Sequence, residues 1–183
     1  MVRAVDRVRD RLARATNALN AERLQYAIVG SSAVLAWIAS VDESATRFTN
    51  DIDFLAHRSD QMRLKSALST AGFDAQASGH HLIFVEGSQP SSRHALRVVF
   101  AGEYLRESDL AITPSLIEFV NFGAARVLSL QPLVEMLLID HRVNARVDVR
   151  DMIDVGLIDA TWTARFQAEL GARLQALLDD PDG

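Results

Sequence analysis

The stretch Tyr26-Ala27-Ile28-Val29-Gly30-Ser31-Ser32 decides the fold that this sequence predicts. Its four apolar residues are typical of a short buried strand, and Gly30 ends the run. A largely apolar segment of helical character follows to about Ser40, and we expect Ser31 or Ser32 to cap its first turn. The stretch therefore predicts a strand, a tight glycine turn and a helix.

A second short strand is predicted by Asp51-Ile52-Asp53-Phe54-Leu55, in which polar and apolar residues alternate. Residues two apart on a strand project from one face of the sheet, so Asp51 and Asp53 are expected side by side. Two neighbouring carboxylates repel each other, and a divalent cation relieves that repulsion. Magnesium is commonly bound by one or two carboxylates together with substrate phosphates, and we therefore expect Mg²⁺ at Asp51 and Asp53.

The glycine turn predicts a phosphate site next to these aspartates. A glycine lets the backbone approach a phosphate closely. The helix that starts there directs its unpaired N–H groups and the positive end of its dipole at the same point. We expect Gly30, Ser31 and Ser32 to contact phosphate groups, with a serine hydroxyl as an added donor.

The rest of the chain predicts an α/β (α+β) fold, with a mixed sheet of about five strands flanked by helices and a helical C-terminal part. We interpret residues 1–183 as one domain, divided into an N-terminal helix (1–22), a mixed-sheet core that holds the metal and nucleotide site (24–104) and a helical part (114–180). Further strands are expected at 73–77, 81–85 and 95–100, with a turn at Gly87–Ser92 between the last two. Further helices are expected at 59–70, 133–142, 147–155 and 161–178, with a shorter piece near 114–119.

Composition excludes several classes of function. The chain has no cysteine, which rules out disulfides, zinc-thiolate sites and thiol nucleophiles and is typical of a cytoplasmic protein. A net charge of −5 argues against generic binding of nucleic acid, which depends on surplus basic residues. The apolar runs fall well short of the roughly 20 residues that cross a bilayer, so we expect no membrane partner.

The N-terminal helix carries basic residues along one face, interleaved with Asp6 and Asp10. This face is either a docking surface for an acidic protein partner or RNA, or a solvated helix face. The basic residues concerned are Arg3, Arg7, Arg11 and Arg14.

Arg47-x-Thr49-x-Asp51-x-Asp53 after a Gly-Ser turn resembles the nucleotidyltransferase superfamily, in particular the AbiEii-like, minimal nucleotidyltransferase branch of abortive-infection and toxin-related proteins. The resemblance covers residues 26–55 well and residues 127–129 and 133–154 more loosely. It implies transfer of a nucleoside monophosphate from a nucleoside triphosphate, ATP first, to a hydroxyl or phosphate acceptor with Mg²⁺. The turn would hold the phosphates, Asp51 and Asp53 the metals, and Arg47 or Arg97 the nucleotide.

The chain departs from this family pattern at its third carboxylate. The family has a third carboxylate on a neighbouring strand that bridges the metals and acts as the base. The strand at 96–100 has Arg97 instead, which cannot bind a metal but suits a phosphate. Glu103, just beyond the strand, is the candidate for this third catalytic carboxylate.

A second departure lies in the helix 133–142. The family tends to have a lysine there that reaches the triphosphate, and Leu137 occupies the aligned position. Lys65, the single lysine of the chain, lies on a different helix. Candidates to compensate are Arg142, Arg146 and Arg150.

Two functions follow from these residues. The first is a Mg²⁺-dependent nucleotidyltransferase whose acceptor is a tRNA, a protein side chain or a small molecule. The second is a catalytically degenerate member of the fold that acts as a binding module or as a component of a toxin–antitoxin pair. Arg97 and Leu137 are the reasons to keep the second function open.

Overall fold

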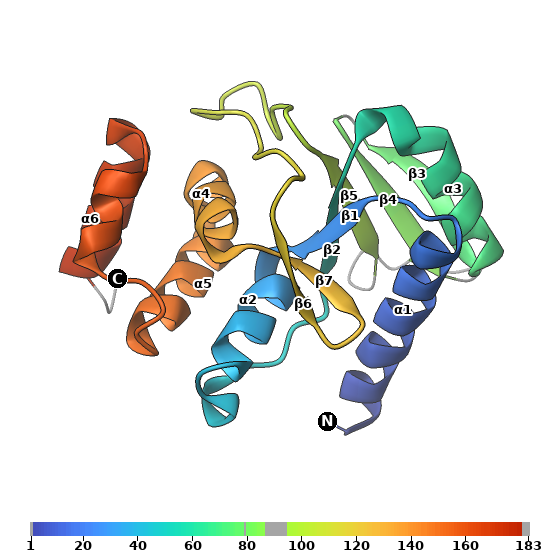
Figure 1. Ribbon diagram of the computed structural model, residues 1–183, viewed down its shortest axis with the longest axis horizontal. Coiled ribbons are helices and arrows are strands. Elements are labelled where there is room, and N and C mark those ends of the chain that lie inside the picture. The colour runs from blue at the N-terminus through green and yellow to red at the C-terminus, as the bar shows by residue number, and fades with distance from the viewer. Residues whose placement is uncertain (1, 79, 87–94, 181–183) are drawn as a thin grey trace.

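The computed structural model of the chain describes residues 2–78, 80–86 and 95–180. At its centre is a seven-stranded mixed sheet in the order β3-β4-β5-β2-β1-β7-β6 (Figure 1). The expected α/β class is confirmed, with seven strands in place of about five. The strands are β1 (Tyr26–Val29), β2 (Ile52–Ala56), β3 (Phe73–Ser78), β4 (His81–Glu86), β5 (Leu96–Phe100), β6 (Phe119–Phe122) and β7 (Ala125–Leu128).

The middle strands run in both directions. β1 pairs antiparallel with β2 and parallel with β7, while β2 pairs parallel with β5. Every residue of β1 and β2 is buried, because helices cover both faces of the sheet at this point. This burial explains why Tyr26–Val29 is apolar without interruption.

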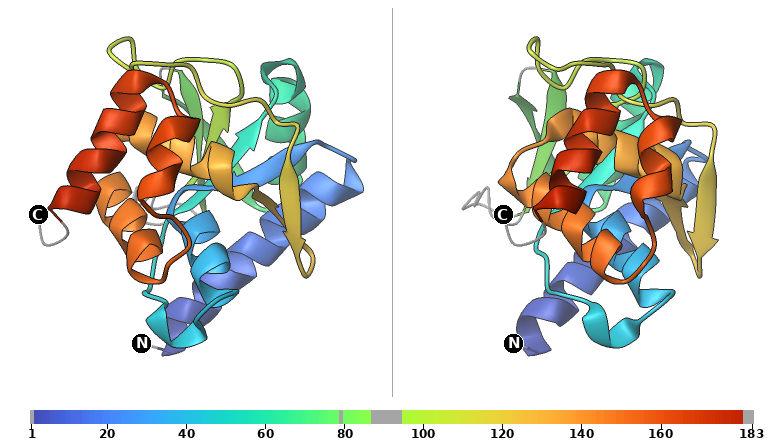
Figure 2. Two further views of the ribbon diagram at one scale, coloured as in Figure 1. Left: turned by 60° about the vertical axis from the view of Figure 1, so that its left-hand side comes forward. Right: turned by 90° about the vertical axis from the view of Figure 1, so that its left-hand side faces the viewer.

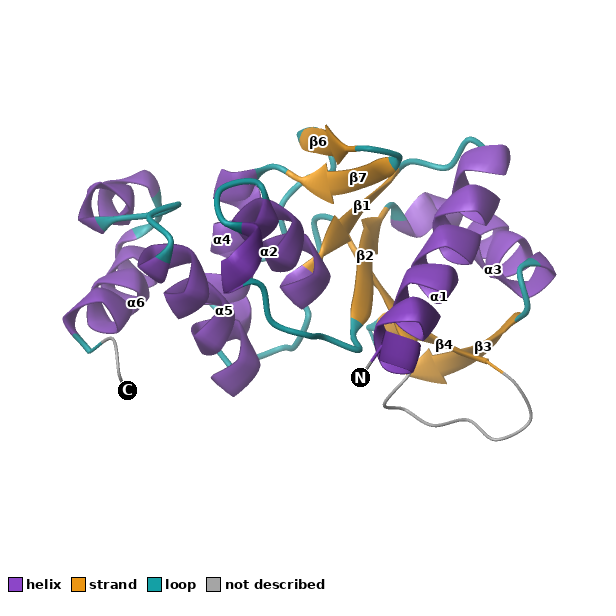
Figure 3. Cartoon of the chain, turned by 90° about the horizontal axis from the view of Figure 1, so that it is seen from below, coloured by secondary structure: helices purple, strands orange, loops and turns teal. Residues whose placement is uncertain are grey.

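Helices pack on the two faces of the sheet (Figures 1 and 3). On one side lie α1 and α3, and on the other lie α2, α4 and α5, with α6 outermost against α4 and α5 (Figure 2). The helices are α1 (Val2–Ala21), α2 (Gly30–Ala39), α3 (Gln61–Thr70), α4 (Leu130–Asp140), α5 (Val143–Asp154) and α6 (Ala168–Asp179). In the residues that the structure describes, no helix is both long and apolar enough to cross a membrane.

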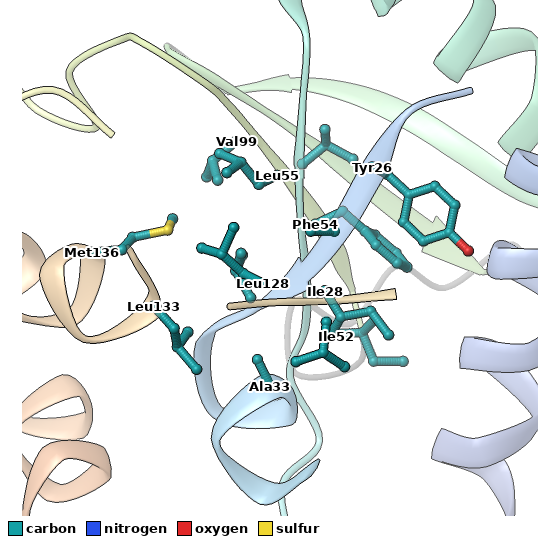
Figure 4. Packing of buried hydrophobic residues seen from close by; sticks show 14 of the residues in the cluster. Tyr26, Ile28, Ala33, Ile52, Phe54, Leu55, Val99, Leu128, Leu133 and Met136 are labelled. Carbon is teal, nitrogen blue, oxygen red and sulfur yellow. The ribbon is translucent and has the colours of Figure 1, made fainter. Parts of the chain in front are cut away.

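The core joins the sheet to both helical layers (Figure 4). Tyr26 and Phe54, on adjacent strands, meet edge to face with their ring centroids 5.6 Å apart. On the other side of the sheet, Leu133 and Met136 of α4 are buried, and Met136 points toward Leu128 of β7. Packing on both faces fixes the central strands, which carry the residues of the candidate site.

The predicted helix at 114–119 is wrong, and the segment predicted as helical from 114 onward begins with a hairpin. Residues 114–118 form an irregular loop and turn, followed by β6 and β7. The turn between these strands contains Gly123, which has a φ of +62°. Two four-residue strands, one of them largely exposed, are too short to show the alternating pattern that identifies a strand in a sequence.

Two further helix predictions are corrected. The helix expected at 161–178 is a 3₁₀ helix, Ala160–Arg165, followed by α6, because Phe166 and Gln167 adopt extended backbone angles between them. The serine cap predicted for α2 is also wrong: Val29 is the cap residue, and no side chain caps the helix. The turn expected at Gly87–Ser92 lies outside the described residues.

Two of the four basic residues noted on α1, Arg11 and Arg14, are bound within the protein. Arg11 is 4% exposed and donates to the Asn50 carbonyl. Arg14 forms ion pairs with Asp10 and Glu86. These two side chains fasten α1 to the body of the protein.

The core predicts a large loss of stability when Phe54 is shortened. Phe54→Ala removes a fully buried ring, and we expect the free energy of unfolding to fall by about 3–5 kcal/mol. Urea denaturation followed by circular dichroism measures this. The control, Met62→Ala, changes a side chain that is 73% exposed and should stay within about 0.5 kcal/mol of the wild type. Similar losses in both variants would contradict the packing described here.

Candidate functional site

A cavity of about 710 Å³ lies between the sheet and the junction of α4 and α5. Gly30, Ser31, Asp51, Asp53 and Arg97 line its sheet side, although they come from three separate segments of the chain. Leu137 and several polar residues at the end of α4 and on α5 line the helix side. The structure thus brings the glycine turn and both aspartates of the sequence analysis to one cavity.

Gly30 is in contact with Asp53. Its φ of +62° falls in the left-handed region, which favours glycine. A Cβ atom at this position would lie 2.6 Å from Oδ2 of Asp53. The turn and the aspartate can approach this closely because residue 30 has no side chain.

Asp53 is held by Arg97. The parallel pairing of β2 and β5 places these two residues opposite each other. Nε of Arg97 donates to Oδ1 of Asp53 at 2.9 Å, and Nη2 donates to Oδ2 at 2.7 Å. Burial opposes the charge of Arg97, but Asp53 outweighs this effect, and the pKa of the guanidinium lies above its ordinary value. Both oxygens of Asp53 are therefore occupied by one arginine.

Asp51 differs from Asp53 in its surroundings. It lies just before β2 and is exposed, and its carbonyl accepts a hydrogen bond of 2.6 Å from the Ser32 hydroxyl. Its backbone N–H donates to Oγ1 of Thr49 at 3.2 Å. Within the described residues its carboxylate accepts no hydrogen bond. Thr49 and Ser32 thus hold the backbone of Asp51, which lines the cavity.

Ser31 and Arg47 both bind Asp148, an aspartate that was not among the site residues expected from the sequence. The Ser31 hydroxyl donates to Oδ2 of Asp148, on α5, at 2.7 Å. Arg47 forms ion pairs with Asp148 and with Asp151 one turn further along α5, with Nε 2.6 Å from Oδ2 of Asp151. Asp148 and Asp151 share a helix face because they are three residues apart. Arg47 thus joins the loop before β2 to α5 and does not line the cavity.

Asp148 is almost fully buried and has a perturbed acidity. Burial raises its pKa from 3.8 to about 6, while the hydrogen bond from Ser31 and the charge of Arg47 act in the opposite direction. The signal in the sequence was weak: Asp148 is an aspartate three residues before Asp151, within residues 133–154, which the family resemblance covers only loosely.

The helix side of the cavity carries positive charge. Arg142 lines the cavity and forms an ion pair with Asp140. Arg146 also lines it, and among the described residues its guanidinium has no hydrogen bond or ion pair, with Nε buried. Nδ1 of His141, at the left-handed residue that ends α4, is likewise buried without a partner there. The cavity therefore contains a positive charge that no carboxylate of the described chain neutralises.

Several residues selected from the sequence lie elsewhere. Glu103 is bound by Arg58, with Nε of Arg58 2.9 Å from Oε1, and is not among the residues that line the cavity. Arg150 donates to the carbonyl of Asp180. Leu137, at the position where the resembling family has a lysine, is 5% exposed and forms part of the cavity wall.

The residues present do not fit the expected pair of magnesium ions. Among the residues that the structure describes, no group of three or more Asp, Glu, His or Cys side chains is placed to hold a metal ion. Of the two expected ligands, Asp51 is free and Asp53 is occupied by Arg97. Arg97 stands where the third carboxylate was expected, and Glu103 does not replace it.

The fold of the chain, with its mixed sheet and helices on both faces, is similar to that of a nucleotidyltransferase in two solved structures. The solution structure of the antibiotic-resistance factor ANT(2'')-Ia matches with a TM-score of 0.57 and 14% identity, over 94% of this chain and 91% of that chain. The crystal structure of ANT(2'')-Ia in complex with adenylyl-2''-tobramycin matches with a TM-score of 0.56 and 13% identity, over 96% and 97% of the respective chains. No family model and no curated protein matches the sequence. At this identity the likeness is one of fold.

The contact between Gly30 and Asp53 predicts a matched pair of variants. Gly30→Ala and Gly102→Ala both place a side chain at a positive φ, which costs roughly 1–2 kcal/mol, but nothing lies within 4 Å of the new Cβ at Gly102. We expect Gly30→Ala to lose more stability in urea denaturation, since Asp53 must move away. Equal losses would show that the turn and the aspartate are not in contact.

The acidity of Asp148 predicts a pH dependence of stability. Between about pH 4 and 6 this aspartate ionises in the unfolded chain but stays protonated in the folded one. The free energy of unfolding should therefore fall as the pH rises through this window, by up to roughly 1.4 kcal/mol per pH unit. Asp148→Asn should remove this component. Urea denaturation of both proteins across the window measures it, and a difference that is independent of pH would be the contrary result.

Proposed function

We propose that the cavity binds a nucleoside triphosphate, with ATP as the first to be tested. The observation that carries this proposal is the guanidinium of Arg146, which lines the cavity and has no acidic partner in the described chain. A buried or half-buried charge without a counter-ion is costly, so an anionic ligand is the expected partner. Phosphate groups suit arginine because its planar donors match their oxygens.

Other groups around the cavity support phosphate binding. Gly30 exposes the backbone at the start of α2, where the helix directs its first N–H groups and the positive end of its dipole. Arg97 and Arg142 line the same cavity as Arg146. The volume of about 710 Å³ lies inside the range of roughly 300–1,000 Å³ that is usual for small-molecule sites.

The fold adds a further argument. The structurally similar ANT(2'')-Ia has been crystallised with adenylyl-2''-tobramycin, in which an adenylyl group is joined to an acceptor. A nucleotide-derived ligand is thus compatible with this arrangement of sheet and helices. In this chain, the arginines and the glycine turn that line the cavity are the groups that would bind a nucleotide.

Transfer of a nucleoside monophosphate to a hydroxyl or phosphate acceptor is the second candidate. It is favoured by the free carboxylate of Asp51 in the same cavity as the glycine turn. Against it stand the ion pair between Asp53 and Arg97 and the apolar side chain of Leu137. Binding without transfer would favour a binding module or a toxin–antitoxin component on this fold, and we place binding first.

Calorimetry with ATP, GTP, CTP and UTP tests the proposal. We expect at least one triphosphate to bind the wild type and to stabilise it by about 2.7 kcal/mol at a hundredfold excess over its Kd. Arg146→Gln should weaken this binding, since it removes the unpaired charge. The matched control is Arg165→Gln, because Arg165 stacks on Trp162 and does not line the cavity. Binding of none of the four triphosphates would refute the proposal.

A transfer assay separates the two candidates. ATP labelled at its α-phosphate is incubated with Mg²⁺ and tRNA, protein or small-molecule acceptors. Transfer of the label to the acceptor is followed, together with release of the unlabelled pyrophosphate. We expect binding without release. Release that is abolished in Asp51→Asn would instead establish the nucleotidyltransferase reaction.

A further inference from the structure

We infer that the Arg97 guanidinium takes the place of a divalent cation beside Asp53, so that the cavity binds the phosphate groups of its ligand without a metal ion. The first half of this inference concerns the chain alone. The second half rests on the proposed function, since it assumes a phosphate-bearing ligand.

The position of Arg97 is fixed by the sheet. Asp53 and Arg97 are register partners on parallel strands, and the pairs on either side of them, Ile52 with Leu96 and Phe54 with Val98, are fully buried. A shift of either strand by one residue would turn its two apolar side chains to the other face of the sheet. The buried neighbours therefore hold the Arg97 guanidinium against the Asp53 carboxylate, whereas an exposed arginine could move to another partner.

The bidentate contact excludes a metal ion from Asp53. Both carboxylate oxygens accept hydrogen bonds, of 2.9 and 2.7 Å, and the aspartate side chain is 10% exposed. Magnesium requires oxygen ligands at roughly 2.0–2.1 Å in near-octahedral geometry. It would have to displace the guanidinium and then remain next to that positive charge. Asp51 alone is left, and a single exposed carboxylate is a weak site for this ion.

The same guanidinium can bind phosphate groups of the ligand, as a divalent cation would. Its side chain is 36% exposed and lines the cavity. Asp53 engages one N–H of Nη2 and that of Nε, and in the described residues the remaining N–H groups have no partner. The carboxylate of Asp53 fixes the orientation of the guanidinium, and the remaining N–H groups can donate to phosphate oxygens of the ligand. Arg146, across the same cavity, adds a second charge that needs no metal.

The first experiment measures Mn²⁺ binding without nucleotide, by electron paramagnetic resonance. We expect no site in the wild type. Arg97→Asp, which sets a third carboxylate beside Asp51 and Asp53, should acquire a Mn²⁺ site, and the added change Asp53→Asn should remove it. Arg97→Gln frees Asp53 without adding a negative charge. It replaces Arg97→Asp in this experiment if circular dichroism shows that Arg97→Asp is unfolded.

Two results of this experiment would overturn the inference. One is a Mn²⁺ site in the wild type that Asp53→Asn abolishes. The other is a folded Arg97 variant that still binds no Mn²⁺, because some feature other than Arg97 would then exclude the ion.

The second experiment measures the affinity for ATP by calorimetry, in excess EDTA and in excess Mg²⁺. We expect similar affinities for the wild type in both. Arg97→Gln should weaken binding in EDTA by roughly 10- to 100-fold, as expected for a lost hydrogen bond to a charged group, whereas Arg165→Gln should not change it. Wild-type affinity that rises tenfold or more with Mg²⁺ contradicts the inference. Absence of ATP binding in both conditions contradicts the proposed function instead, and the Mn²⁺ experiment still decides the role of Arg97.

Discussion

The site depends on one carboxylate, that of Asp53, which has the Gly30 turn on one side and the Arg97 guanidinium on the other. The turn can come this close because it lacks a Cβ atom, and the arginine is brought there by the pairing of β2 with β5. Desolvating a carboxylate is costly unless its oxygens are hydrogen-bonded and its charge is balanced, and Arg97 does both. The same contacts determine how wide the cavity is at this wall and which charges face it.

The opposite wall is fixed by a second set of charged contacts. Arg47, in the loop before β2, binds Asp148 and Asp151 of α5, and Ser31 of the glycine turn also binds Asp148. Loop, turn and helix are thus joined at one buried carboxylate. Breaking a buried ion pair by removing one partner is costly, because it leaves an uncompensated charge in the interior. The helical layer is held at a set distance from the sheet, and the cavity lies between them.

Local patterns predicted much of this structure, and longer-range contacts account for what they missed. Tyr26–Val29 and the glycine after it identify a strand and a turn, because both signals lie within a few residues. β6 and β7 escaped notice because each has a polar residue among its four, and so lacks the uninterrupted apolar run that identifies β1. Arg97 was recognised as a departure from the family pattern, but its pairing with Asp53 depends on strand order. Asp148 and Arg146 lie more than 90 residues beyond Asp53 in the sequence, where spacing carries no information about proximity.

Helices cover the faces of the sheet, and its strand order ends in two edge strands, β3 and β6. β6 is its last strand, and Phe119 and Val120 on it are 44% and 37% exposed. An edge of this kind presents backbone donors and acceptors that another polypeptide can extend by adding a strand. β6 has no charged side chain that would oppose pairing with another strand. Its length of four residues limits self-association through this edge instead, because so short a strand offers few backbone hydrogen bonds.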